Sequence, residues 1–312
     1  MAGRTLVVGC GLIGSHVVRA LAEQGTPATV LTRSRPAAAE ILAAVGEGHL
    51  HLGDATDPAT VSAALRDVER VAYCAGGLLP AAAERDPERE RELTLGPLRT
   101  VLRALRDRPG TRFAYISSGG TVYGNPARLP ARESDPAVPI SAYGTVHLAC
   151  EGEVERERSE HGLRSRILRY STVYGEYQQP DRGQGVIATF LSRIERGAEI
   201  ELYGDGATIR DYIYAGDAAR AMIALLDSDE EAPVVNVGEG TGTSLIEVLR
   251  MAESEVGREA RIVRRGERGF EVHQIVLDTT LLHQLVELEI TPLDEGIRRT
   301  HRWLAGAVAG TP

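Results

Sequence analysis

The feature that most constrains this chain is a glycine motif near its start, Gly9-Cys10-Gly11-Leu12-Ile13-Gly14. The motif follows an apolar run, Thr5–Val8, that is typical of a buried strand, and it opens an apolar-periodic helix. Glycines in a strand-to-helix turn let the backbone approach a pyrophosphate, and the helix N-terminus attracts the negative charge. We therefore predict a dinucleotide site at this turn, formed by Gly9, Gly11, Leu12, Ile13 and Gly14.

The end of the second expected strand, at residues 28–31, indicates which dinucleotide binds. NAD sites usually carry an acidic residue about 20 residues after the glycines, where it bonds the ribose 2′-hydroxyl. This chain has Thr32, Arg33, Ser34 and Arg35 there, and the two guanidinium groups are suited to a 2′-phosphate. We expect these four residues to bind the cofactor and NADP(H) to be preferred, with NAD(H) still possible.

The alternation of strands and helices continues along the first half of the chain. It predicts an α/β fold, a Rossmann-like doubly wound parallel sheet with helices on both faces. Ligands of such sheets bind beyond the carboxyl ends of the strands. We therefore expect Asp54, Ala75, Gly76 and Ser118 to lie at the site, with Asp54 near the adenine. Residues 142–160 read as a long helix whose glutamates form a solvated stripe.

After Tyr170 the alternation loosens, and glycine and proline cluster between residues 175 and 185. We expect residues 1–170 to form an NADP-binding Rossmann domain, with later returns at about 211–240. Residues 171–312 should form mainly a smaller C-terminal lobe that covers the substrate.

Tyr143 and His147 lie one turn apart on the same face of the expected helix. A cation beside a phenol lowers the phenol's pKa from about 10, so the pair is a candidate proton-transfer unit. A histidine is only partly charged at neutral pH, however, so the effect should be weaker than that of a lysine. The hydroxyls of Ser118 and Thr121, which follow the strand expected at residues 112–117, are candidates to bond a substrate oxygen.

Composition excludes several classes of partner. The 312 residues carry a formal net charge of -9, which argues against nucleic acid or an anionic membrane as partner. Three cysteines give no disulfide framework, and the histidines lack metal-ligand spacing, so we expect no metal and a reducing cytoplasm. The apolar N-terminal run is too short for a signal peptide or a membrane span.

Several motifs together resemble those of the extended short-chain dehydrogenases/reductases, in the group of nucleotide-sugar epimerases, dehydratases and 4-ketoreductases. The motifs are SSGGTVYG at 117–124, SAYGTVHLACE at 141–151, RDYIY at 210–214 and NVG at 236–238. The resemblance covers nearly the whole chain. It implies a small-molecule substrate and a homodimer built from the helices expected at 88–106 and 142–160.

The resemblance also implies roles for individual residues. The family's catalytic tyrosine matches Tyr143, but the lysine that holds the nicotinamide ribose is His147, and the substrate-orienting hydroxyl position is Gly119. Ser118 and Thr121 are the nearest substitutes for that hydroxyl. The remaining matches are an asparagine position on the pyrophosphate and two arginines for the substrate phosphates. These are Thr172, Arg210 and Arg268. Apart from the resemblance, Tyr170 is a further candidate to line the cofactor site.

Loss of the lysine harms proton donation less than proton abstraction, because a donor must be neutral. The leading hypothesis is therefore an NADPH-dependent ketoreductase acting on a cyclic ketone, either a 4-keto nucleotide sugar or a secondary-metabolite carbonyl such as a polyketide. The alternatives are an NAD-dependent nucleotide-sugar 4-epimerase and an NADP(H)-binding protein without catalysis. A dehydratase is disfavoured because its acid pair would fall at Gly120 and Thr121.

Overall fold

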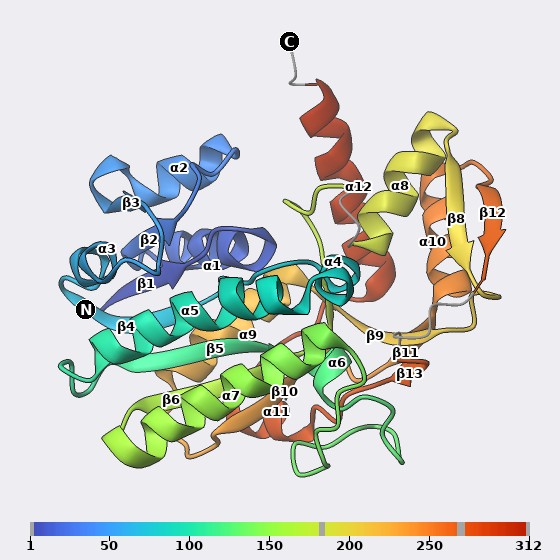
Figure 1. Ribbon diagram of the computed structural model, residues 1–312. Helices are drawn as coiled ribbons and strands as arrows, with labels where there is room; N and C mark the ends of the chain where they lie inside the picture. The colour runs from blue at the N-terminus through green and yellow to red at the C-terminus, as the bar shows by residue number, and fades with distance from the viewer. Residues whose placement is uncertain (1–2, 181–184, 267–271, 310–312) are drawn as a thin grey trace.

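The computed structural model describes residues 3–180, 185–266 and 272–309, and its centre is a parallel sheet of seven strands (Figure 1). The strand order is β10-β6-β5-β4-β1-β2-β3, and every neighbouring pair is parallel. The predicted fold class is thereby confirmed. The strands of this sheet are β1 (Arg4–Val8), β2 (Ala28–Thr32), β3 (Leu50–Leu52), β4 (Val68–Tyr73), β5 (Arg112–Ser118), β6 (Arg164–Tyr170) and β10 (Val234–Val237).

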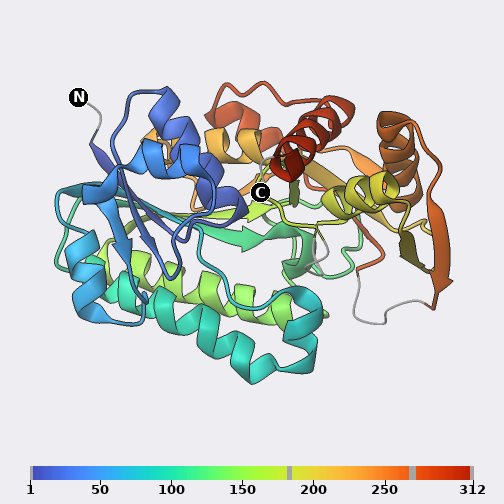
Figure 2. The same cartoon turned by 90° about the horizontal axis from the view of Figure 1, so that it is seen from above.

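Helices cover both faces of the sheet, as Figure 2 shows from above. One layer contains α1 (Leu12–Glu23), α2 (Ala39–Val45), α9 (Ala215–Asp227) and α11 (Thr280–Leu285). The other contains α3 (Pro58–Ala64), α5 (Pro87–Leu105) and α7 (Ala142–His161). Val7 packs in the first layer while Leu6 and Val8 pack in the second. Because alternate residues of a strand face opposite sides, a strand covered on both faces must be continuously apolar.

A smaller lobe follows β6 and lies to one side of the sheet (Figure 1). Its helices α8 and α10 pack together, and α12 packs against both around a third apolar cluster. The capping box at the start of α10 pairs Ser244 with Glu247 and so fixes where this helix begins. The elements are β7 (Thr172–Tyr174), α8 (Val186–Arg196), β8 (Glu199–Tyr203), β9 (Ile209–Tyr214), β11 (Gly242–Ser244), α10 (Leu245–Val256), β12 (Arg261–Arg265), β13 (Gln274–Ile275) and α12 (Leu293–Ala309).

Short elements depart from the sequence-based expectations. The segment after β5 forms the short helix α6 (Gly119–Val122), and a 3-10 turn, η1 (Glu47–His49), precedes β3. Helices α3 and α4 (Pro80–Arg85) were not predicted, because each is too short to show a helical period. Within the described ranges no helix is both long enough and apolar enough to span a bilayer.

The expected solvated stripe on α7 is wrong for three of its glutamates. Glu151, Glu153 and Glu157 are buried because α7 packs against α5 and the sheet. Arg99 of α5 donates to Glu153 at 2.7 Å and Arg106 donates to Glu157 at 2.5 Å. Glutamates can occupy this face because arginines of neighbouring elements supply the compensating charge.

Candidate active site

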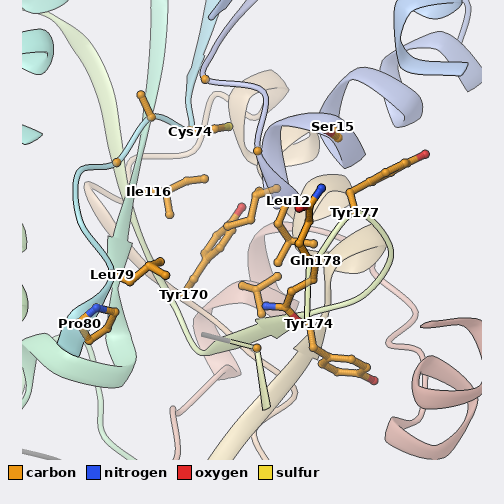
Figure 3. Close-up of a pocket in the computed structure, with 18 of the residues that line it drawn as sticks. Leu12, Ser15, Cys74, Leu79, Pro80, Ile116, Tyr170, Tyr174, Tyr177 and Gln178 are labelled. Carbon is orange, nitrogen blue, oxygen red and sulfur yellow. The ribbon is translucent and has the colours of Figure 1, made fainter. Parts of the chain in front are cut away.

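A cavity of about 2260 Å³ opens at the carboxyl ends of the sheet strands and extends under the smaller lobe. Figure 3 shows Leu12 at the start of α1, Ile116 of β5 and Tyr170 of β6 gathered in one part of it. Residues from β8 and β9 of the smaller lobe line its other end. A single cavity therefore joins the glycine turn to the lobe expected to bind the substrate.

The glycine turn is shaped by two glycines that no larger residue could replace. Gly9 has φ +88°, and a Cβ there would lie 2.7 Å from the Cα of Ala75. A Cβ on Gly14 would lie 2.0 Å from the carbonyl oxygen of Gly9, so the helix starts against the strand. Gly11 caps α1 without a side-chain cap, and the first turn has no acidic residue. The helix N-terminus therefore offers unshielded N–H groups to an anion beside the cavity.

The residues predicted to select the cofactor lie along the same cavity. Thr32, Arg33, Ser34 and Arg35 all line it at the end of β2, and both arginines are exposed. Asp54 also lines it and is exposed, and its Oδ1 accepts from the backbone and hydroxyl of Thr56, each at 2.8 Å. These bonds lower the pKa of Asp54, with a smaller contribution from Arg33, so the carboxylate is charged beside that guanidinium.

The loop after β4 brings Ala75 and Gly76 to the cavity. Glu90 of α5 holds this loop, because its Oε2 accepts from the backbone N–H of Leu78 at 2.5 Å. Its Oε1 accepts from the Thr94 hydroxyl at 2.8 Å. Glu90 was not predicted from the sequence as part of this site.

Tyr143 and His147 both line the cavity, and their rings lie 4.4 Å apart between centroids. On its other side, the His147 Nδ1 is 2.9 Å from the hydroxyl of Tyr115 on β5. The His147 Nε2 is buried and has no hydrogen-bond partner among the described residues. Leaving a buried polar atom unpaired costs about 1–3 kcal/mol, so a ligand in the cavity that His147 lines would recover this energy by bonding Nε2.

The expectation that His147 lowers the pKa of Tyr143 is wrong in this structure. Burial lowers the pKa of His147 to about 4, so the imidazole is neutral at pH 7. Burial also raises the pKa of Tyr143, and the charges of Glu90 and Cys150 would raise it further. Desolvation outweighs the neighbouring cation that the sequence suggested, so the pair consists of a neutral phenol and a neutral imidazole.

The loop after β5 supplies hydroxyls from two of its residues. Ser118 and Thr121 line the cavity, and Thr121 makes only a long bond of 3.4 Å to the Ser118 carbonyl. Gly119, between them, is buried. A Cβ there would lie 2.8 Å from Leu277 and 3.0 Å from the Arg169 carbonyl. This packing does not support a substrate contact from Gly119.

The other predicted site residues come from β6, β7 and β9. Thr172 and Arg210 line the lobe end of the cavity. Tyr170 also lines it, but its hydroxyl donates to the Ala218 carbonyl at 2.8 Å, so only its ring faces a ligand. Arg268, the second expected phosphate ligand, lies outside the described residues.

A buried polar network lies next to the loop of Ser118 and Thr121 and holds it in place. The Ser117 hydroxyl donates to Glu151 at 2.5 Å, and Arg169 donates to the same carboxylate at 2.7 Å. The Arg169 guanidinium lies 4.8 Å from the Tyr123 ring centroid, and Tyr123 donates to Asn236 at 2.7 Å. The sequence reasoning missed this network because its members come from five different segments.

The residues present fit a nicotinamide dinucleotide. The glycine turn leaves room for a pyrophosphate, the uncapped start of α1 favours its charge, and the unpaired Nε2 of His147 lies at the catalytic end. These three features lie along one cavity, which supports the dinucleotide site predicted from the glycine motif.

Comparison with known proteins agrees with this assignment. The family model for the NAD dependent epimerase/dehydratase family matches residues 5–238. A dTDP-4-dehydro-6-deoxy-D-allose reductase of Streptomyces bikiniensis is 31% identical, over 97% of this chain and 96% of that protein. UDP-glucose 4-epimerase of Thermotoga maritima, solved with UDP-glucose, is 28% identical with a TM-score of 0.90, over 98% of this chain and 99% of that one.

A second solved neighbour is the UDP-glucose 4-epimerase of Thermus thermophilus in complex with NAD. It is 30% identical with a TM-score of 0.88, over 97% of this chain and 99% of that one. The relatives thus include extended short-chain oxidoreductases that reduce a keto sugar and others that epimerise a nucleotide sugar. The chain itself belongs to the NAD dependent epimerase/dehydratase family of enzymes.

Proposed function

We propose that the protein is an NADPH-dependent ketoreductase that reduces the carbonyl of a cyclic ketone. The observation that carries this proposal is the pair of Tyr143 and His147, whose rings lie 4.4 Å apart at the cavity. Burial holds Tyr143 as the phenol and His147 as the neutral imidazole. A neutral phenol is the form that donates a proton to a developing alkoxide, whereas abstraction of a hydroxyl proton requires a base.

Each residue of the site has a separate role in the proposed reaction. A bound nicotinamide dinucleotide supplies the hydride. Tyr143 donates the proton to the substrate oxygen, while the hydroxyls of Ser118 and Thr121 orient that oxygen from the adjacent loop. His147 holds the cofactor ribose without carrying a charge. The Ser117–Glu151–Arg169 network keeps the loop in place beneath them.

The proposed preference for NADP(H) rests on the arginines at the end of β2. Arg33 and Arg35 line the cavity where a 2′-phosphate would lie, and charge-assisted bonds to phosphate are strong. NAD(H) remains the alternative cofactor. Asp54 is charged and exposed nearby, and the Thermus relative was solved with NAD.

A 4-keto nucleotide sugar is the first candidate substrate. Arg210 lines the lobe end of the cavity, where it suits a diphosphate, and the Streptomyces relative is described as a reductase of such a keto sugar. Thr172 stands where the family has a pyrophosphate-binding asparagine, and Gly119 brings no hydroxyl. These two departures favour the second candidate, a cyclic ketone without a diphosphate, such as a polyketide carbonyl.

The test is single-turnover oxidation of NADPH, followed by absorbance, with a dTDP-4-keto-6-deoxy sugar and with a cyclic ketone that lacks a nucleotide. We expect NADPH to be consumed in proportion to a carbonyl substrate and NADH to be a poorer donor. A purified protein that retains NAD tightly and interconverts UDP-glucose and UDP-galactose with no net NADPH consumption would overturn the proposal. That result would identify the alternative function, an NAD-dependent 4-epimerase, which is supported by the two epimerase structures.

We also propose that two copies associate through α5 and α7. The two helices lie side by side on one face of the sheet, where a second copy could complete a four-helix arrangement (Figure 1). Light scattering of the eluting protein is expected to give twice the mass of the chain. A monomeric mass at micromolar concentration would contradict this arrangement.

A further inference from the structure

The side chains around His147 form a short chain of neutral hydrogen-bonding groups. Tyr143, His147 and Cys150 follow one another on the sheet-facing side of α7, and Tyr115 of β5 lies between the last two. The Tyr115 hydroxyl is 2.9 Å from the His147 Nδ1 and also contacts the thiol of Cys150. Tyr115, His147 and Cys150 are all buried, so bulk water does not compete for these bonds.

The direction of the bond between Tyr115 and His147 follows from what each group can offer. A neutral imidazole has one N–H donor and one bare nitrogen acceptor, while a phenol has a single O–H to donate. An imidazole nitrogen is a much better acceptor than a thiol, so the Tyr115 hydroxyl should donate to Nδ1 rather than to Cys150. The thiol proton of Cys150 can in turn donate to the Tyr115 oxygen. With Nδ1 as the acceptor, the imidazole proton must be on Nε2.

We propose that Tyr115 is a positioning residue that fixes His147 as the Nε2–H tautomer, so that this neutral histidine presents a hydrogen-bond donor to the cofactor ribose. His147 lines the cavity and its buried Nε2 has no partner among the described residues, so this donor is the one left for a ligand oxygen. A lysine would offer such a donor whatever its neighbours do, whereas a histidine offers it in one tautomer only. The pair of Tyr115 and His147 thereby replaces the donor function of a lysine but not its charge.

This inference rests on the proposed cofactor site, but it does not depend on the direction of the reaction. The experiment uses unreacted protein labelled with nitrogen-15, whose imidazole nitrogens report the tautomer by long-range proton–nitrogen NMR at pH 7. The chain has eight histidines, and loss of one signal set in His147→Gln assigns His147. We expect wild-type His147 to show a protonated Nε2 and a bare Nδ1. A protonated Nδ1, or an even mixture of tautomers, would overturn the proposal without any variant being needed.

Tyr115→Phe removes only the hydroxyl and should let both tautomers be populated. Loss of one oriented hydrogen bond should weaken binding of both NADPH and NADH by about 3- to 10-fold, measured by fluorescence titration. The matched control is Tyr73→Phe, because Tyr73 is equally buried and its ring lies 6.0 Å from that of Tyr115. The control should change neither the tautomer nor the affinity. Equal effects of the two variants would show that Tyr115 acts only through packing.

A double variant separates the tautomer from other effects of the lost hydroxyl. In a His147→Lys background no tautomer exists, so adding Tyr115→Phe should leave both cofactor affinities unchanged. A persistent 3- to 10-fold loss in that background would overturn the assignment of Tyr115 as acting through His147. If no ketone is reduced but the tautomer and affinities behave as expected, the proposed function fails while this inference stands.

Discussion

The two ends of the cofactor site are built in different ways. At the glycine turn the backbone makes the site, because a Cβ on Gly9 would collide with Ala75 after β4 and a Cβ on Gly14 would collide with the Gly9 carbonyl. On α7 side chains make the site, because Tyr143, His147 and Tyr115 depend on hydrogen bonds and burial. A backbone site tolerates almost no substitution, whereas a side-chain site can change its chemistry while the fold persists.

This difference explains how the catalytic end can hold a histidine, where the resemblance implies a lysine, without loss of the fold. His147 faces the cavity from α7, and Tyr115 supplies a partner for its Nδ1. What changes is the charge, because burial keeps the imidazole neutral. The catalytic end is therefore better suited to giving a proton than to taking one.

The largest expected effect is at the catalytic end. Tyr143→Phe removes the proposed proton donor, and the rate of ketone reduction should fall by about 100- to 10,000-fold while the affinity for NADPH stays within about twofold. The measurement is single-turnover NADPH oxidation together with a cofactor titration. Tyr177→Phe is the matched control, since Tyr177 lines the same cavity but bonds Glu40. An unchanged rate in Tyr143→Phe would move the donor role to Thr121, Ser118 or the substrate itself.

Adding a single methyl group at the glycine turn should destabilise the protein. Gly14→Ala would place a Cβ 2.0 Å from the Gly9 carbonyl, and neither backbone can move without separating α1 from β1. We expect a loss of about 3 kcal/mol in the free energy of unfolding, measured by urea denaturation without cofactor. Gly11→Ala is the control, because no atom lies within 4 Å of its added Cβ. Equal stability of the two variants would show that the turn is not as tightly packed as described.

The arginines at the end of β2 allow a sharper test of the cofactor end. Replacing Arg33 and Arg35 together by alanine should weaken NADPH binding by about 10- to 100-fold, because charge-assisted bonds to the 2′-phosphate are lost. NADH binding should stay unchanged, since NADH has no such phosphate. Paired titrations with NADPH and NADH measure both quantities. An equal loss for the two cofactors would mean that the arginines contact a group that both share, and would remove the argument for NADP(H).

The sequence predicted the backbone end well because its signals are local. A strand, three glycines and a helix follow one another within residues 5–21. The catalytic end was predicted only in outline. Tyr143 and His147 were found from their spacing, but their pKa shifts depend on burial by distant segments, which no local pattern reports.

Tyr115 was missed for the same reason, since nothing in the run Arg112–Ser118 indicates that one tyrosine meets a histidine on another element. The glutamates of α7 were misread because a charged residue is exposed in most proteins. Here Arg99, Arg106 and Arg169 come from elsewhere in the chain to pair with them. Ion pairs between residues far apart in the chain cannot be predicted from a single sequence.

The smallest expected effect concerns stability and pH, and it tests whether His147 is neutral. Its folded pKa is about 4, below the unfolded value near 6.5, so between these values the unfolded chain binds the extra proton. Stability should therefore fall as pH falls from 6.5 to 4, and His147 should contribute up to about 1.4 kcal/mol per pH unit to that slope. The groups that face His147 are Tyr115, Tyr143 and Cys150, whose pKa values burial raises, so all three stay neutral across this range.

The measurement is urea denaturation at pH 7, 6 and 5 of the wild type, of His147→Gln and of His283→Gln, an exposed histidine that serves as control. Only His147→Gln should flatten the slope. Asp211, whose pKa burial raises to about 6, acts with the opposite sign in all three proteins and cancels from the comparison. If His147→Gln keeps the wild-type slope, the pKa of His147 in the folded chain equals the unfolded value near 6.5. The imidazole would then be partly charged near neutral pH, and the case for one-way reduction would weaken.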